Sequence, residues 1–142
     1  PDVTMTQKVW NLQKIISDMP QYEPETEHYF HGGMYCRKVT RCAGALVVGK
    51  VHKKEHFYLI LEGTVMVTTD DGVQEITGPQ LLLSKPGTKR AVYAVTDATC
   101  MTFHATRAVT VDAAEEELVE EDPAAMLGVG NRIKQQEIEV TS

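Results

Sequence analysis

Residues 45–69 read ALVVGKVHKKEHFYLILEGTVMVTT, and this stretch decides the fold. Its β-branched and aromatic residues recur in short runs, and the turn-forming pair Glu62-Gly63 separates two of them. Such runs are typical of antiparallel strands joined by tight turns. No segment between them is long enough for the helices that connect parallel strands. The stretch therefore predicts an antiparallel, all-β domain.

The same two-residue period extends outward to Gly33 and Arg107 and predicts eight strands. They are expected at 34–40, 45–51, 56–61, 64–69, 73–76, 80–84, 90–95 and 99–106. The pair Asp71-Gly72 predicts a hairpin between two of these strands. Strands so short and so closely spaced are expected to roll into a jelly-roll barrel of two packed sheets over residues 33–106.

An amphipathic helix is predicted before the strands, over residues 6–19. Val9, Leu12 and Ile16 lie on one helical face, Thr6 is a candidate N-cap, and Pro20 is expected to end the helix. A polar stretch, residues 21–27, separates this helix from the barrel. Because the apolar face cannot remain exposed, the helix is expected to pack on the outside of one sheet or to cover a partner.

The last part of the chain, residues 112–142, is predicted to be an acidic segment followed by a tail. Asp112 with Glu115 fits a capping box and favours a short helix, expected to be a solvated face, with docking onto a basic partner as the alternative. The chain is therefore expected to hold one domain, residues 1–111, and this C-terminal extension.

Charge and composition exclude several classes of function. The 142 residues carry a net charge of −6, and the acids cluster between Asp112 and Asp122. No basic stripe with interleaved aromatic residues is present, which argues against nucleic-acid binding. No apolar run approaches the roughly 20 residues of a membrane span. We expect a cytoplasmic protein, or one that belongs to an assembly built there. The three cysteines lack the spacing of a zinc site or a disulfide framework.

Three histidines form the candidate metal site. His52 and His56 flank the connection before the most apolar strand, and His104 shares the parity of Cys100 and Thr102 on the last strand. Inside a barrel, imidazoles from neighbouring strands can meet around one ion. A set of three histidines suits zinc, nickel or iron. The alternative is a cluster of hydrogen-bonded histidines in a small polar pocket.

The spacing of this region resembles the first motif of the cupin superfamily. Gly44, His52 and Gly63 keep the family spacing, whereas Lys50 and His56 stand where the family has a histidine and a glutamate ligand. Arg90, after Pro86-Gly87, occupies the place of the last histidine ligand. The resemblance implies a cupin-type double-stranded β-helix with a rearranged set of metal ligands.

Further segments resemble cupin-like proteins of tailed bacteriophages, up to about residue 119. The string from Pro86 to Arg90 is the most specific of them. This resemblance implies a non-enzymatic component of a phage particle, such as a head, neck, tail or fibre accessory, located in the virion if the chain is phage-encoded. Its helix and termini would then bind neighbouring subunits. A homo-oligomer, a dimer or larger, is also expected.

The alternative function is a cupin that binds a metal or a small anion, including a metal-dependent dioxygenase, isomerase or lyase acting on a small acidic or sugar-like substrate. Here Lys50 and Arg90 would hold the anionic group, because a guanidinium grips a carboxylate or phosphate with paired hydrogen bonds. Tyr58 or Tyr93 would serve as an acid. Salt bridges of Lys50 and Arg90 with Glu55 or Glu62 near the barrel mouth are the competing interpretation.

Overall fold

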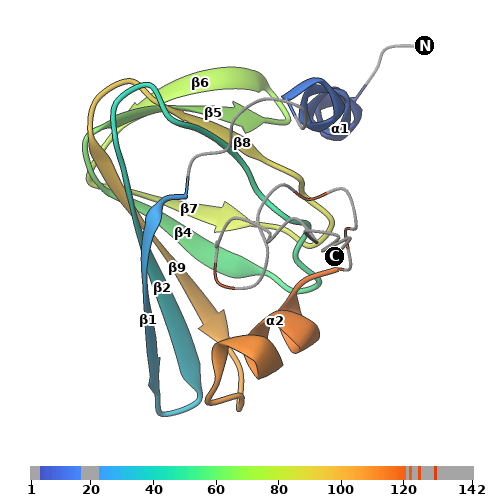
Figure 1. The fold of residues 1–142 in the computed structure, drawn as a ribbon, viewed down its shortest axis with the longest axis vertical. Helices are drawn as coiled ribbons and strands as arrows, with labels where there is room; N and C mark the ends of the chain where they lie inside the picture. The colour runs from blue at the N-terminus through green and yellow to red at the C-terminus, as the bar shows by residue number, and fades with distance from the viewer. Residues whose placement is uncertain (1–3, 17–22, 121, 123–124, 126–129, 131–142) are drawn as a thin grey trace, which may run out of the picture.

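Two antiparallel sheets packed as a sandwich make up the core of the protein (Figure 1). The computed structural model describes residues 4–16, 23–120, 122, 125 and 130. Within this part of the chain, five strands form one sheet in the order β1-β2-β9-β4-β7 and four form the other in the order β3-β8-β5-β6. This two-sheet architecture, with a helix before it and a short helix after it, agrees with the predicted mostly-β fold.

The strands and helices follow one another along the chain in a simple order. They are α1 (Met5–Ile16), β1 (Glu25–His31), β2 (Met34–Arg41), β3 (Leu46–Val48), β4 (His56–Glu62), β5 (Thr64–Thr69), β6 (Gly72–Thr77), β7 (Gln80–Ser84), β8 (Ala91–Ala94), β9 (Ala98–Ala105) and α2 (Val111–Leu118). No helix among the described residues is long and apolar enough to cross a membrane.

Every second side chain of the strands faces the interior of the sandwich. On β9, Ala98, Cys100, Thr102 and His104 are buried and the residues between them are not. The apolar members of such faces meet in one cluster between the sheets, formed by Tyr58, Ile60, Val65, Val67, Ile76, Val92, Ala98 and Cys100. Because period-two patterning decides which face a side chain takes, it also fixes the register of each strand.

Two turns explain why the chain reverses where it does. Gly63, between β4 and β5, has φ +86°, and a Cβ there would lie 2.2 Å from the Asp97 carbonyl oxygen, so only glycine fits. The hairpin expected at Asp71-Gly72 is confirmed: β5 and β6 pair from Thr64↔Thr77 to Thr69↔Gly72.

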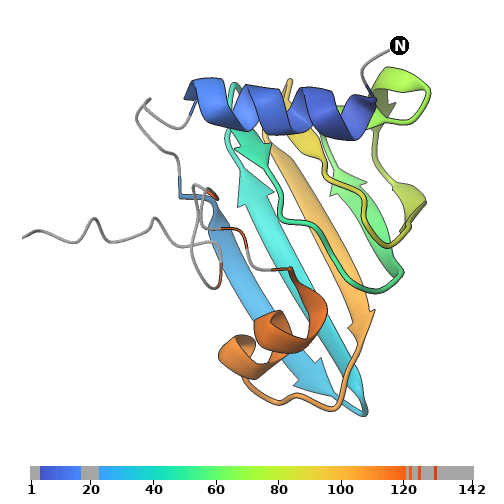
Figure 2. The same ribbon diagram turned by 90° about the vertical axis from the view of Figure 1, so that its right-hand side faces the viewer.

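The helix α1 packs on the outside of the four-stranded sheet. This is the first of the two predicted arrangements, packing on a sheet rather than covering a partner. Its Val9 is buried with Val48 and Ala91, which face outward from β3 and β8. Figure 2 shows α1 lying across one end of the strands, away from α2. The expected N-cap was wrong: the helix begins at Met5, and the Thr4 hydroxyl accepts the Gln7 backbone N–H at 3.1 Å. Pro20 lies outside the described residues.

A buried lysine, Lys89, connects α1 and Asp122 to the rest of the domain. The Lys89 ammonium, fully buried, donates to the Gly49 carbonyl and to Asp122 Oδ2, each at 3.0 Å. The same nitrogen lies 3.9 Å from the centre of the Trp10 ring on α1. Burial lowers the pKa of Lys89, while Asp122 opposes that shift. Lys89 thus links α1, the loop before β8 and the segment after α2.

The acidic segment differs from its predicted role as a solvated face. It does form a helix, α2, but the N-cap is Thr110, whose side chain accepts from Ala113 N, rather than a capping box begun by Asp112. Ala114 and Leu118 pack against Tyr35 of β2. Glu115 is buried rather than solvated. α2 therefore belongs to the core of the domain and closes one end of the sandwich (Figure 1).

One strand was missed in the sequence. The sheet begins at Glu25 with β1, not at residue 33, and β1 pairs with β2 from Glu25↔Thr40 to His31↔Met34. No β1 residue is fully buried, and its burial only alternates between exposed and half-buried. An edge strand of this polar composition carries little of the apolar alternation on which strand prediction depends.

Candidate functional site

A cavity of about 90 Å³ opens between the two sheets. Its wall combines apolar side chains with an unusual number of cationic ones. The lining residues are Arg37, Val39, Arg41, Val47, Gly49, Lys50, His52, His56, Tyr58, Ser84, Thr88, Arg90, Val92, Cys100, Thr102 and Val119. Concave, partly apolar sites with a few convergent polar groups are where proteins bind small ligands.

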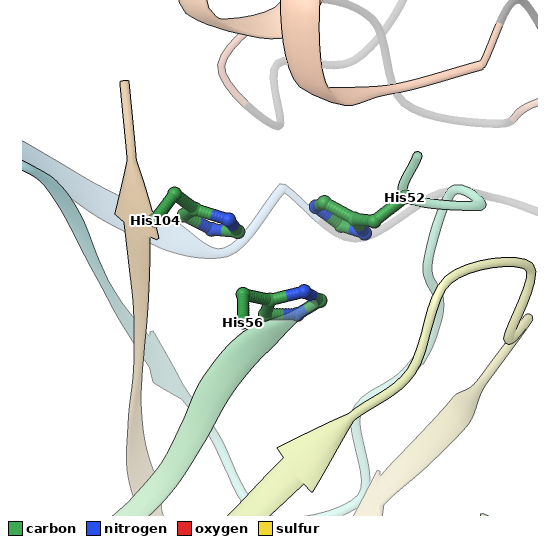
Figure 3. Close-up of side chains that lie close together, drawn as sticks. All are labelled: His52, His56 and His104. Atoms are coloured by element: carbon green, nitrogen blue, oxygen red, sulfur yellow. The ribbon is translucent and has the colours of Figure 1, made fainter. Parts of the chain in front are cut away.

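At one end of this cavity the three predicted histidines meet. His56 begins β4, His104 lies near the end of β9, and His52 comes from the loop between β3 and β4. Figure 3 shows their rings pointing toward one another. One nitrogen from each ring can be chosen so that all three lie within 4.8 Å of one another. The ring centres are 4.4–5.2 Å apart. We call this group the histidine triad.

The loop that carries His52 is held in place by the end of α2. His52 forms an isolated antiparallel bridge with Val119. On either side of it, Lys53 N donates to Leu118 O at 2.7 Å and Glu120 N donates to Val51 O at 2.9 Å. The triad therefore depends on the C-terminal helix for one of its members.

All three imidazoles are neutral at physiological pH. Burial, and then the positive charge of Arg37, lower the pKa of His52 to about 2 and that of His104 to about 3. Burial likewise lowers the pKa of His56 to about 4, although the Lys54 backbone opposes this shift. A neutral imidazole keeps one nitrogen lone pair, which is the form that binds a metal.

Each ring of the triad also has a hydrogen-bond partner. His52 bonds to the Lys50 backbone, His56 Nδ1 lies 3.4 Å from Lys54 O, and His104 Nε2 lies 2.8 Å from Thr102 Oγ1. Metal-binding histidines nearly always donate their second N–H in this way, which fixes the tautomer. The Lys54 carbonyl can only accept, so His56 Nδ1 carries the N–H and His56 Nε2 is left for a metal, whereas the Thr102 hydroxyl can donate to His104 or accept from it.

The donor set fits a transition-metal ion after a small adjustment. Zinc–nitrogen bonds of about 2.0–2.1 Å at tetrahedral angles place ligand nitrogens about 3.4 Å apart. The nitrogens here lie within 4.8 Å, so the rings must turn inward slightly. Three imidazoles from one side leave further coordination positions open toward the cavity.

An aromatic stack supports the triad from behind. The Tyr35 ring lies 5.6 Å from the His104 ring and 4.6 Å from the Phe30 ring, centre to centre. The Tyr35 hydroxyl is 2.5 Å from His28 Nδ1. This stack limits rotation of His104 on the side away from the cavity.

Two cations beside the triad share one carboxylate. Glu115 Oε1 lies 3.6 Å from Arg37 Nη1, and Glu115 Oε2 lies 3.7 Å from Lys50 Nζ. Lys50 does form a salt bridge, as the alternative interpretation expected, but the expected partners Glu55 and Glu62 were wrong. The acid is Glu115 of α2. The remaining cations of the wall, Arg41 and Arg90, have no ion pair among the described residues.

The tyrosines expected as acids differ in position. Tyr58 lies in the cavity wall with its hydroxyl buried. Tyr93 does not: it faces outward from β8 and is 43% exposed. The difference follows from strand parity, because Val92 and Ala94 take the inward positions of β8. A role for Tyr93 in the cavity is therefore excluded.

Sequence inspection missed Arg37, Arg41 and Glu115. The signal for the two arginines was present in β2, where they share the inward parity of Tyr35 and Val39. Basic residues in a row of buried positions indicate a polar cavity more often than a packed core. No comparable signal marks Glu115, because its burial depends on how α2 docks.

Comparison with solved structures identifies the fold class. The sequence matches no family model and is similar to no curated protein. The structure is similar to a cupin superfamily protein from Desulfitobacterium hafniense, with TM-score 0.52 and 14% identity over 67% of this chain and 87% of that one. It is also similar to KdgF from Halomonas sp., with TM-score 0.54 and 11% identity over 62% and 84% of the two chains.

A larger enzyme shows the same similarity over part of its length. The salicylate 1,2-dioxygenase of Pseudaminobacter salicylatoxidans aligns with 80% of this chain and 35% of its own, with TM-score 0.56 and 12% identity. Identities this low establish the fold and nothing of the activity. The chain therefore has the fold of the cupin superfamily, as the motif spacing around His52 implied.

Proposed function

We propose that this protein is a metal-binding cupin-fold protein that holds a divalent transition metal at His52, His56 and His104 and binds a small anion in the adjoining cavity. The observation that carries the proposal is the triad itself. Three neutral imidazoles converge from a loop and two strands, and each ring is held by a hydrogen bond. Zinc, nickel and iron all accept such a ligand set.

The surroundings of the triad support a site for ligands rather than a purely structural metal. Structural zinc sites are closed by four protein ligands, whereas three ligands beside a cavity leave a position for water or substrate. A metal ion bound there would act as a Lewis acid toward a ligand oxygen. The cationic cavity wall would hold and orient an anionic ligand next to it.

Zinc titration of the metal-free protein tests the proposal. Competition with a chromophoric chelator is expected to show one tight zinc per chain. His56→Ala and His104→Ala are expected to abolish it. His31→Ala removes an exposed imidazole outside the triad and is the matched control, with affinity unchanged. Wild-type zinc affinity equal to that of His56→Ala would overturn the metal site in favour of a hydrogen-bonded histidine cluster.

A role in a phage particle stays a prediction. It was expected to act through the chain ends, and residues 1–3 and 131–142 lie outside the described part of the chain. The apolar face of α1, one of the surfaces expected to bind neighbours, is already covered by β3 and β8. Mass spectrometry of purified virions checks the prediction where the chain is phage-encoded.

The expected homo-oligomer is likewise a prediction, and the structure supplies the surface on which to test it. Phe57, Leu81 and Leu83 are about half exposed on the outer face of β4 and β7, and Phe57 pairs with Leu83 across the strands. An exposed apolar sheet face of this kind is typical of an interface. If the protein forms dimers, Leu83→Glu is expected to shift sedimentation toward the monomer.

A further inference from the structure

The cavity contains a second group of polar side chains, next to the histidine triad, and this group has donors without acceptors. Arg41 ends β2, Tyr58 lies in β4, and Arg90 comes just before β8. All three line the cavity. Among the described residues, six buried side-chain nitrogens and oxygens have no hydrogen-bond partner. Four of them belong to these three side chains: Arg41 Nε, Arg41 Nη1, Tyr58 Oη and Arg90 Nε. The other two are Arg37 Nε, which also belongs to a residue of the cavity wall, and Gln13 Oε1.

Arg41 is the most isolated cation of this group. It is only 6% exposed, yet its Nε and Nη1 donate to nothing in the described part of the chain. It pairs with Ala98 of β9 in the register, and the next inward residue of β2 is Val39. Burying an unpaired charge costs several kcal/mol, so buried cations normally have a partner.

Arg90 and Tyr58 face the same space. Arg90 Nη1 donates to Ser84 Oγ at 2.7 Å, and its guanidinium carbon lies 5.2 Å from the centre of the Tyr58 ring. These contacts fix the guanidinium but leave Arg90 Nε without a partner. Arg90 is therefore already oriented in the absence of a ligand, which lowers the entropy that a ligand loses on binding.

Tyr58 adds a neutral donor. Burial raises the pKa of its phenol to about 12, although the positive charges of Arg41 and Arg90 act in the opposite direction. The phenol thus keeps its proton at neutral pH. The Cys100 thiol beside it is a weak hydrogen-bonding group. The hydroxyl is free to donate to a stronger acceptor.

No acid offsets these charges from within the cavity. The lining residues include no Asp or Glu, and Glu115 is shared between Arg37 and Lys50. The acid whose charge reaches Arg90 is Asp70, which is not part of the wall. A cavity wall of donors with uncompensated positive charge fits a ligand group that only accepts hydrogen bonds and carries negative charge.

We propose that Arg41, Arg90 and Tyr58 form a carboxylate-binding subsite, and that the ligand of this protein is a small organic carboxylate. Its carboxylate oxygens accept from the two guanidinium groups and the phenol. The rest of the molecule extends along the cavity toward His52 and His56. Because the subsite and the histidine triad share one cavity, the assignment rests on the proposed function and specifies the chemical class of its ligand.

Calorimetric titration of the metal-free full-length chain with malonate tests the subsite apart from the metal. Acetate, inorganic phosphate and the uncharged malonamide are titrated in parallel at constant ionic strength. Malonate is expected to bind, acetate more weakly, and malonamide not at all, because only the carboxylates supply charged acceptors. Phosphate binding in the absence of malonate binding would overturn the carboxylate assignment.

Substitutions locate the binding to the named residues. Arg41→Gln is expected to weaken malonate binding about 10- to 100-fold, as loss of a charged hydrogen bond does. Arg107→Gln removes the same charge from an exposed position and is the matched control, with affinity unchanged. Tyr58→Phe keeps the ring and the packing, and a loss of about 5-fold or more is expected. It remains informative if Arg41→Gln fails to fold.

The outcomes separate this assignment from the metal site. Malonate binding that persists in His104→Ala and is lost in Arg41→Gln supports the subsite, whether or not zinc binds. Absence of malonate binding to the wild type, or equal binding by wild type and Arg41→Gln, overturns it even when zinc binds tightly. Failure of zinc binding with malonate binding retained overturns the metal proposal and supports the carboxylate subsite.

Discussion

The two ends of the space between the sheets are lined by the same strands and are opposite in character. β4 supplies Ile60 to the apolar cluster and His56 to the triad, and β9 supplies Cys100 and His104 in the same way. Backbone pairing of β4 with β9 runs from Phe57↔Phe103, next to the triad, to Ile60↔Cys100 in the apolar cluster. The two ends differ only in which side chains occupy the inward-facing positions of these strands.

This contrast shows how one sheet combines stability with a binding site. Burial of apolar side chains at one end contributes to the free energy of unfolding in proportion to the area removed from water. Neutral histidines and unpaired guanidinium groups at the other end lower the free energy of unfolding, because polar groups are desolvated there. Substitutions at the polar end are therefore expected to weaken ligand binding with little effect on the free energy of unfolding. Substitutions at the apolar end are expected to lower the free energy of unfolding with little direct effect on binding.

The largest effect on stability is expected for Ile60→Ala at the apolar end. Ile60 is fully buried among Val65, Val67 and Cys100. Its truncation is expected to lower the free energy of unfolding by about 2–5 kcal/mol, through lost burial and the cavity left behind. Urea unfolding measures the change. Val73→Ala, at an exposed position of β6, is the control; equal losses in both variants would contradict the assigned core.

His52→Ala at the polar end is expected to show the opposite pattern. Zinc affinity should fall about 100-fold or more, because one of three nitrogen ligands is lost. The free energy of unfolding of the metal-free protein should change by less than about 1 kcal/mol, since His52 is only half-buried and lies in a loop. Chelator competition and urea unfolding measure the two quantities. A large loss of stability with unchanged zinc affinity would reverse the comparison.

The polar end is also expected to make stability depend on pH. In the folded protein the pKa values of His56 and His104 are lowered to about 4 and about 3, whereas in the unfolded chain they return to about 6.5. Below pH 6.5 the unfolded state binds more protons, so the free energy of unfolding falls as the pH falls toward those folded values. The slope approaches roughly 1.4 kcal/mol per pH unit for each histidine.

Urea unfolding of the chelator-treated protein between about pH 7 and about pH 5 measures this slope, above the range in which most carboxylates titrate. His56→Gln is expected to reduce the slope, and His31→Gln, at an exposed position, is expected to leave it unchanged. Identical slopes in the wild type and His56→Gln would show that the folded protein does not keep His56 neutral.

The smallest effect is expected outside the sandwich. Tyr93 faces away from the cavity, whereas Tyr58 lies in its wall. Tyr93→Phe should therefore change both the free energy of unfolding and malonate affinity by no more than about 0.5 kcal/mol. The same pair of assays, unfolding and calorimetry, measures it. A loss of malonate binding in Tyr93→Phe as large as that in Tyr58→Phe would place β8 in the opposite register.

Most of the fold could be predicted because alternation and turn chemistry are local. The runs around Tyr58 and Val65, and the glycines at 63 and 72, predict strands and turns within a few residues of their observed bounds. β1 escaped because its residues are only half-buried at most, so no apolar row marks it. The N-cap of α1 was misplaced by two residues, at Thr6 instead of Thr4, because both threonines are suitable caps.

The site was predictable only in part. His52 and His56 are close in sequence, and the parity of His104 on the last strand put it on the same inner face. Arg41 and Arg37 were overlooked because charged residues in a strand are usually taken as solvent-facing. Glu115 required knowledge of tertiary docking, since nothing in the acidic segment distinguishes it from Glu116 before Tyr35 and α2 meet.

The ion pair of Lys89 has a practical consequence for anyone who trims the protein. A version shortened to end at residue 119 would delete the Asp122 carboxylate and leave an ammonium group enclosed without its counter-charge, and removing α1 would take away the Trp10 ring beside it. Either deletion removes one partner of a buried cation whose backbone carbonyl partner, Gly49, belongs to the cavity wall. The shortest version suited to crystallisation or ligand screening therefore keeps both the leading helix and the residues just beyond the trailing one.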